Sequence, residues 1–285
     1  MDEASSITNF VTCSIVGEGI QTLGLGNQLF SIAATLGLAL NNDATPLFNI
    51  QRAQLPYRDN ILRNLKEIKN NVITHYYNEP FFEYKEIPYC AGLSLNGYFQ
   101  SEKYFSNRRK DILDVLEISE DDLEFVNNNF GDMLKGTTAS FHIRRGDYTL
   151  PQYSSHHPIL KMDYYSKAMS YFDKDVSYLV FSDDIEWAKQ NLKGDQFKFI
   201  TKNKIEGDDV ITTLDISKGG WPDYIEMYLM SMCDHNIIAN SSFSWWGAWL
   251  NKNPDKTVIA PKNWFGPAYG NKNDSDLIPE SWTRV

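Results

Sequence analysis

Short apolar runs rich in β-branched residues alternate with stretches of helical periodicity along the chain, and this alternation constrains the fold most. Runs that predict strands lie at 10–16, 46–50, 93–99, 139–143, 178–181, 197–200, 236–239 and 257–260. Stretches that predict helices lie at 28–40, 60–69, 102–116, 120–134, 164–172, 185–191, 222–233 and 243–251. The alternation indicates an α/β protein, in which helices cover the faces of a mainly parallel sheet.

The length and one break in the pattern predict two domains. The 285 residues amount to about twice the ~150 residues of a typical domain. Lys135, Gly136 and Thr137 interrupt the pattern, so we expect one α/β domain over residues 1–135 and a second over 136–285. The second half is the more regular and resembles a doubly wound nucleotide-binding sheet, which binds ligands beyond the carboxyl ends of its strands.

Composition excludes several classes of protein. The formal net charge of −10 argues against general nucleic-acid binding, which needs a broad cationic surface. Three widely spaced cysteines predict reduced thiols and neither a disulfide framework nor a zinc site. The uncharged stretch between Glu18 and Asp43 contains too many glycines and polar residues for a membrane span. No basic residues begin a signal peptide, and we therefore expect a soluble, cytoplasmic protein.

The strongest local signal for chemistry runs from Phe141 to Tyr148. On a strand, His142 and Arg144 share one face, while Phe141 and Ile143 share the other. The motif continues as Arg145, Gly146 and Asp147, where a glycine ends the strand at its carboxyl edge. Arginine forks suit phosphate oxygens and can neutralise a diphosphate without a metal ion. The alternatives are a surface cluster of arginine and aspartate, or, more weakly, an adhesion tripeptide.

A second signal follows the predicted strand at 236–239. A serine-rich helix start there offers N–H groups and the positive end of the helix dipole to an anion. Its residues are Asn240, Ser241, Ser242, Phe243 and Ser244. Taken alone, an ordinary helix cap followed by packed tryptophans is the better interpretation.

Two weaker signals also lie where predicted strands end. The loop with Gly24, Gly26, Asn27 and Gln28 lets backbone N–H groups approach a phosphate or sugar, but it lacks the third glycine of a dinucleotide fingerprint. Asp183 and Asp184 can bind ribose hydroxyls or guanine N–H groups, or can simply favour the N-terminus of the next helix. The acidic pairs at 173/175 and 274/276 have the spacing of a metal-binding pair, but both fall in turn-like sequence and are interpreted as solvated surface. The histidines at 156 and 157 lack a spaced cluster of partner ligands, so we expect no metal site.

Together these motifs resemble the α-1,2-fucosyltransferases of glycosyltransferase family 11. The resemblance covers most of residues 11–265 and rests on the ordered set of motifs at 24–30, 142–148, 181–187 and 240–250. It implies a GT-B fold, in which two Rossmann-like domains face each other across a cleft. It also implies inverting, metal-independent transfer of L-fucose from GDP-β-L-fucose to the 2-hydroxyl of a terminal galactoside, without a cofactor.

The resemblance further implies roles for individual residues. Arg144 would bind the β-phosphate with the helix start at 242–244, and His142 would orient the fucose or the diphosphate. Glu226 would contact guanine, although aspartate is common at that place in the family. The remaining donor contacts would come from Gly24, Gly26, Asn27, Gln28, Arg145, Asp183, Asp184, Asn240 and Ser241.

The catalytic base is our own candidate, Asp147, because it is a carboxylate at the rim of the donor site. The alternative is that Asp147 only fixes the arginines. A related class places a glutamate ten residues after the motif histidine, where this chain has Gln152, so that role does not transfer. Other open interpretations are a fucosyltransferase of α-1,6 type, a non-catalytic sugar-binding module and a nicotinamide-dependent dehydrogenase.

Overall fold

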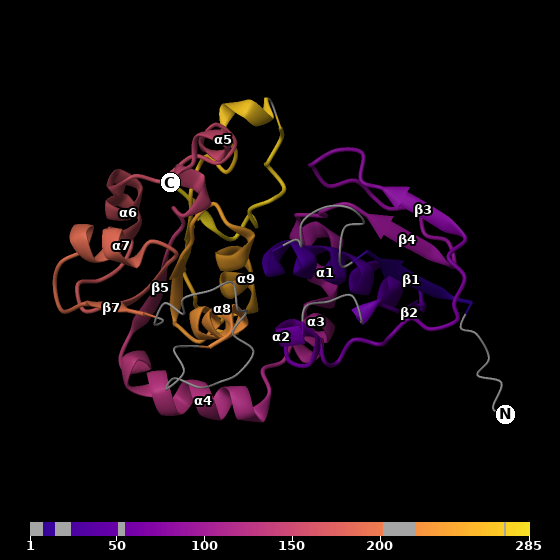
Figure 1. The fold of residues 1–285 in the computed structure, drawn as a ribbon, viewed down its shortest axis with the longest axis horizontal. Coiled ribbons are helices and arrows are strands. Elements are labelled where there is room, and N and C mark those ends of the chain that lie inside the picture. The colour runs from indigo at the N-terminus through magenta and orange to yellow at the C-terminus, as the bar shows by residue number, and fades with distance from the viewer. Residues whose placement is uncertain (1–7, 15–23, 51–54, 202–220, 271) are drawn as a thin grey trace. The chain divides into compact units, whose positions relative to one another are not determined.

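Two parallel β-sheets, each with its own helices, organise the chain (Figure 1). The computed structural model describes residues 8–14, 24–50, 55–201, 221–270 and 272–285. The chain divides into two units, Met1–Glu117 with Asn273–Pro279 and Ile118–Lys272 with Glu280–Val285. The α/β class is confirmed. The division falls between Glu117 and Ile118, ahead of the boundary expected near residue 135.

The sheet of the first unit has the strand order β2-β1-β4-β3, and all its strands are parallel. These strands are β1 (Phe10–Cys13), β2 (Thr45–Pro46), β3 (His75–Asn78) and β4 (Leu93–Asn96). The helices are α1 (Leu25–Asn41), α2 (Leu55–Arg58) and α3 (Arg109–Val115). Helix α1 packs so closely that a Cβ on Gly37 would lie 2.4 Å from the carbonyl oxygen of Tyr104. Strand β1 ends at Cys13, so Ser14 is not part of it, and residues 15 and 16 of the predicted strand lie outside the described residues.

The predicted helix at 60–69 is wrong. Residues 59–64 form hydrogen-bonded turns, although the apolar side chains of Ile61, Leu62 and Leu65 are buried as the helical spacing required. The following residues are extended, because Glu67 forms a parallel bridge with Phe48. The backbone groups of Lys66 and Ile68 are hydrogen-bonded to Phe48 and are therefore not available for a helix.

Two further elements of the first unit differ from the prediction. The stretch 102–116 holds two 3₁₀ turns before α3, because Phe105 leaves helical geometry to lie fully buried, 6.3 Å from the ring of Phe30. Strand β3 was not predicted. It lies at the edge of its sheet, and three of its four residues are exposed, so it has no apolar alternation to reveal it.

The second unit holds a six-stranded parallel sheet in the order β10-β9-β8-β5-β6-β7. Its strands are β5 (Thr138–Ile143), β6 (Ser177–Ser182), β7 (Phe197–Phe199), β8 (His235–Ile237), β9 (Val258–Ala260) and β10 (Thr283–Arg284). Its helices are α4 (Glu120–Phe130), α5 (Pro151–Ser154), α6 (Met162–Met169), α7 (Ile185–Asn191), α8 (Asp223–Ser231) and α9 (Ser242–Leu250). This is the doubly wound strand order of dinucleotide-binding folds.

The alternation along β5 separates the two faces of this sheet. Phe141 and Ile143 lie in the hydrophobic core that includes Tyr165 of α6 and Ala188 of α7. His142 points to the other face, where its ring centroid lies 6.1 Å from that of Phe243 in α9. The predicted placement of His142 on the face opposite Phe141 and Ile143 is confirmed, whereas Arg144 lies beyond the end of the strand. Of the described helices, none is long and apolar enough to cross a membrane.

Helix α4 belongs to the second unit through buried contacts. Ser119 caps it as predicted, accepting a hydrogen bond from the Asp122 N–H at 3.1 Å. The Asp122 carboxylate is buried and accepts a hydrogen bond from the Tyr224 hydroxyl of α8 at 3.0 Å. Phe130 packs against Trp221 with ring centroids 5.1 Å apart. The break at residues 135–137 is therefore a connection inside this unit.

Candidate functional site

The strand order of the second unit predicts a ligand site at the carboxyl ends of β5 and β8. The chain leaves β5 toward β6 on one side and later returns to β8 on the other, so the connections diverge at this pair of strands. A crevice forms outside the carboxyl ends of such a pair, and ligands bind there. The two strongest sequence signals follow these two strands. The fold thus brings them together.

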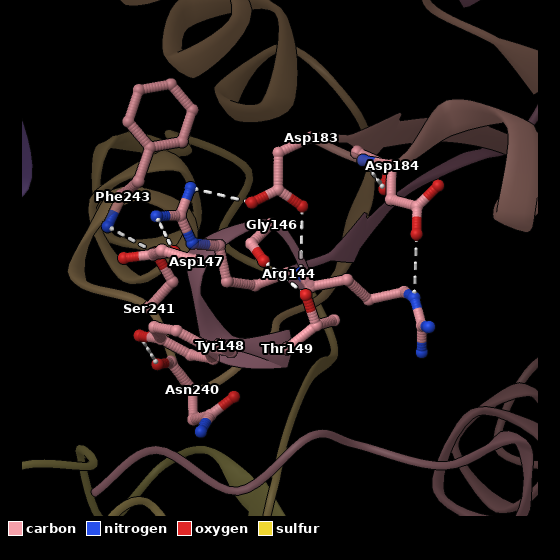
Figure 2. A network of polar contacts seen from close by, with 12 residues as sticks. Arg144, Gly146, Asp147, Tyr148, Thr149, Asp183, Asp184, Asn240, Ser241 and Phe243 are labelled. Atoms are coloured by element: carbon pink, nitrogen blue, oxygen red, sulfur yellow. Dashed lines mark hydrogen bonds and ion pairs between the residues drawn. The ribbon is translucent and has the colours of Figure 1, made fainter. Parts of the chain in front are cut away.

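The hydroxyl of Tyr148 links the two strand ends. It donates a hydrogen bond to the carbonyl oxygen of Asn240 at 3.1 Å, and both residues are buried (Figure 2). Asn240 also donates through Nδ2 to the carbonyl oxygens of Pro158 and Trp264. The Tyr148 ring stacks on His157 with ring centroids 4.5 Å apart. This side of the site is therefore held by buried contacts, and Asn240 acts as one of its supports.

Arg144 lies just beyond β5 and is surrounded by two carboxylates and a ring. Its Nη2 pairs with Asp147 Oδ1 at 2.5 Å, and its Nη1 pairs with Asp183 Oδ2 at 2.9 Å (Figure 2). Its guanidinium carbon lies 5.3 Å from the centre of the Tyr148 ring. About a third of the side chain is exposed, so a ligand can reach it.

Arg145 extends the same network to the start of α7. Its backbone N–H donates to Asp183 at 2.8 Å, and its Nε donates to Asp184 at 3.0 Å. Its guanidinium carbon lies 4.1 Å from the centre of the Trp187 ring. Asp184 also caps α7 by accepting the Trp187 N–H at 3.2 Å, which agrees with the interpretation that this residue favours a helix N-terminus.

The start of α9 faces the same strand ends. Ser241 caps this helix by accepting the Phe243 N–H at 3.4 Å. Ser242 and Phe243 are partly exposed, whereas Ser244 is buried and its hydroxyl accepts the Ala239 N–H at 3.2 Å. An anion could therefore meet the exposed first turn and the positive end of the helix dipole, while Ser244 shapes the turn from inside.

His142 stands directly behind these groups. Burial, together with the nearby Arg144 guanidinium, lowers the pKa of His142 to about 3, so the ring is neutral at pH 7. Its Nδ1 is buried and has no hydrogen-bond partner among the described residues. A neutral imidazole lacks the charge to pair with a diphosphate, so any role of His142 toward a ligand is that of an uncharged group.

The remaining predicted residues lie on other elements of the chain. Glu226 is partly buried on α8. Gly24 precedes α1, whose first turn contains Gly26, Asn27 and Gln28, all in the first unit. Asn27 accepts a hydrogen bond from Gln100 at 2.7 Å. Donor binding by these five residues stays a prediction.

Sequence reasoning gave no role to two residues that support the site, Tyr148 and His157. An aromatic residue four positions after an arginine is a signal that could have suggested Tyr148, because arginine packs readily on ring faces. His157 was considered as a metal ligand, whereas its ring lies against Tyr148 and Tyr269. In the part of the chain that the structure describes, no three His, Cys, Asp or Glu residues are grouped to hold a metal ion.

Comparisons with known proteins place these motifs in a family. The sequence model of glycosyl transferase family 11 matches residues 18–284. The O-antigen biosynthesis glycosyltransferase WbnK of Escherichia coli is 38% identical over 203 residues, which are 68% of this chain and 61% of that protein. An alpha-1,2-colitosyltransferase of Escherichia coli is 32% identical over 199 residues, which are 66% of this chain and 61% of that protein. The chain thus spans 61% of the length of each of these relatives.

A more distant relative covers more of the chain. A galactoside 2-alpha-L-fucosyltransferase of Caenorhabditis elegans is 27% identical over 289 residues, which are 92% of this chain and 77% of that protein. Among solved structures, the fucosyltransferase NodZ from Bradyrhizobium is similar with a TM-score of 0.53 at 13% identity, over 84% of this chain and 92% of that chain. This likeness supports the expected GT-B class of fold. Because the family match covers residues 18–284 and includes the motifs around Arg144, the chain belongs to glycosyl transferase family 11.

Proposed function

We propose that this chain transfers L-fucose, with inversion, from GDP-β-L-fucose to the 2-hydroxyl of a terminal galactoside. The observation that carries the proposal is the meeting of Arg144 and the start of α9 at the strand pair where a doubly wound sheet binds nucleotides. The family and the activities for which its relatives are named support glycosyl transfer.

The chemistry assigns a task to each side of this site. As the diphosphate leaves, positive charge develops at the anomeric carbon and negative charge on the leaving oxygens. Arg144 and the positive end of the α9 dipole, at the exposed first turn with Ser242 and Phe243, stabilise the diphosphate. Asp147 takes the proton of the acceptor hydroxyl. No metal ion is required in this scheme, because the cationic groups of the chain supply the neutralising charge.

The role of Asp147 as base has a direct test. In Asp147→Asn, turnover should fall far more than tenfold while the protein stays folded and binds GDP. Turnover within about tenfold of the wild type, a barrier change of ~1.4 kcal/mol, would remove the role of base.

A second candidate donor is a colitosyl nucleotide. It is favoured by the 32% identity to a protein described as an alpha-1,2-colitosyltransferase. The two candidates differ in the sugar and share the expected linkage, so a comparison of donors with one acceptor separates them.

The experiment that tests the function measures GDP release from GDP-fucose with lactose as acceptor, in EDTA, with NMR analysis of the product. We expect an α-1,2-linked fucosyl product, and we expect Arg144→Ala to abolish it. Arg144→Lys should also be poor, because a point charge does not reproduce the guanidinium fork. Tight GDP-fucose binding without transfer would direct the search to other acceptors. No transfer and no GDP binding would refute the proposal.

A further inference from the structure

The surroundings of Arg144 contain more negative than positive charge. Arg144 and Arg145 form ion pairs with three carboxylates, those of Asp147, Asp183 and Asp184. A diphosphate that approaches Arg144 therefore meets an excess of negative charge at contact distance, which is repulsive. Binding requires that one of these carboxylates move away from the guanidinium.

The two carboxylates on Arg144 are held very differently. Asp183 is fixed at both oxygens, since Oδ1 accepts the Arg145 N–H at 2.8 Å while Oδ2 pairs with Arg144 at 2.9 Å. Asp147 pairs with Arg144 through Oδ1, and among the described residues its side chain makes no other hydrogen bond or ion pair. The Asp147 side chain is 45% exposed and that of Asp183 is 25% exposed. Asp147 can therefore turn into solvent at lower cost.

Gly146 gives Asp183 the space that this arrangement needs. A Cβ on Gly146 would lie 2.5 Å from Asp183 Oδ2, the oxygen that accepts from Arg144 (Figure 2). Any side chain at this position would push the carboxylate away from the guanidinium. The turn between Arg144 and Asp147 is thus shaped around Asp183.

We propose that Asp183 is a positioning residue that fixes the Arg144 guanidinium, and that Asp147 is an exchangeable partner that a diphosphate displaces from it. This inference rests on the proposed function, because the anion is taken to be the diphosphate of a nucleotide donor. When the diphosphate takes the place of Asp147 on Nη2, the carboxylate of Asp147 is released at the rim of the site. The proton acceptor then becomes available with the donor in place.

The first test compares GDP affinities by calorimetry for the wild type and Asp147→Asn. The variant removes the competing carboxylate, so we expect it to bind GDP about three- to fivefold more tightly, the scale of a partly exposed ion pair. Asp175→Asn is the matched control, because it removes the same charge from an exposed aspartate. Asp175 precedes β6, at the end of the strand opposite to Asp183 and the site. It should leave the GDP affinity unchanged.

Two further measurements separate contact competition from a general change of charge. Guanosine carries no phosphate, so its affinity should be the same for the wild type and Asp147→Asn. In 1 M salt, where the Debye length is about 3 Å, the ratio of the two GDP affinities should persist. Unchanged or weaker GDP binding by Asp147→Asn would overturn the proposal. The same gain with guanosine, or a gain that disappears in 1 M salt, would overturn it as well.

The role of Asp183 is tested by one variant that removes its charge and by another that displaces its carboxylate. Asp183→Asn should weaken GDP binding about tenfold, because the charge-assisted contacts that fix Arg144 are lost. Gly146→Ala keeps every charge and should weaken GDP binding in the same direction by pushing Asp183 Oδ2 aside. Thermal melting identifies a variant that fails to fold, and the other variant then decides. Wild-type affinity in a folded variant of either kind would contradict the positioning role.

Inorganic pyrophosphate distinguishes this inference from the proposed function. If the wild type binds pyrophosphate but not GDP, the proposed donor is wrong, and the same comparison of variants with pyrophosphate still decides the roles of Asp147 and Asp183. If neither anion binds to the wild type or to Asp147→Asn, the inference is overturned together with the donor site.

Discussion

The ring of His142 is buried and neutral, and it lies two residues before Arg144. Its pKa of about 3 in the folded protein lies below the ordinary value of 6.5, chiefly because of burial. Between these two values the unfolded chain binds a proton that the folded protein does not. Stability is therefore complete above pH 6.5 and falls as the pH is lowered toward 3, by at most about 1.4 kcal/mol per pH unit.

This residue predicts a measurable pH dependence. His142→Leu removes the titrating group, so its free energy of unfolding should fall less than that of the wild type between pH 6.5 and pH 4. Urea denaturation at several pH values measures the difference between the two proteins, in which other titrating groups largely cancel. Parallel curves for the two proteins would contradict the buried, neutral state of His142.

At the scale of elements, the site depends on how α9 begins. The Ser241 side chain caps this helix, and removing an N-cap hydroxyl costs about 1 kcal/mol of stability. The same turn is the one that faces the ends of β5 and β8. A change at this cap should therefore alter both stability and anion binding.

The chain contains a matched control for this prediction, because Ser119 caps α4 in the same way. Ser241→Ala and Ser119→Ala should each lower the free energy of unfolding by about 1 kcal/mol, measured by urea denaturation. GDP affinity should fall in Ser241→Ala and remain at the wild-type value in Ser119→Ala. An equal effect of both variants on GDP affinity would show that the α9 start has no special part in binding.

The sequence correctly predicted the elements in which the spacing of apolar residues matches the spacing of buried residues. Helix α7 was placed at its observed bounds, and β5 and β6 were found because they are buried on both faces. The two-residue edge strand β10 is only partly buried and was not predicted. The apolar spacing at 60–69 correctly predicted which side chains are buried, but it wrongly predicted a helix. The bridge between Phe48 and Glu67 holds the backbone there in an extended conformation. Periodicity cannot reveal such a distant partner.

The candidate site was predictable to the same extent. The arginine motif and the helix start could be located because each follows a recognisable strand. The ion pairs of Arg144 and Arg145 with Asp183 and Asp184 could not, because they depend on the pairing of β5 with β6. Neighbouring strands in a sheet are set by the fold as a whole and not by either segment alone.

At the scale of the whole molecule, α4 is tied to the second unit by a buried carboxylate. Asp122 accepts the Tyr224 hydroxyl, and its second oxygen, Oδ2, has no hydrogen-bond partner among the described residues. Loss of the hydroxyl would leave a buried carboxylate poorly satisfied, which costs about 1–3 kcal/mol. The attachment of α4 is therefore sensitive to a single oxygen atom.

Tyr224→Phe should lower the free energy of unfolding by about 1–3 kcal/mol, measured by urea denaturation. In an Asp122→Ala background the same change should cost much less, because the carboxylate is gone. Equal costs in the two backgrounds would show that the hydroxyl stabilises the protein through other contacts.

The path of the chain through its two units has a practical consequence for exchanging parts between relatives. After leaving the first unit at Glu117, the chain returns to it for Asn273–Pro279 before ending in the second. Within that returning stretch, Asp276 pairs with Lys103 at 2.6 Å and accepts the Tyr84 N–H at 3.0 Å. In a chimaera with a single junction near residue 117, Lys103 and Tyr84 would come from one relative and residue 276 from the other, so these contacts would not be matched. A faithful graft of the first unit needs three junctions and must carry this seven-residue stretch with it.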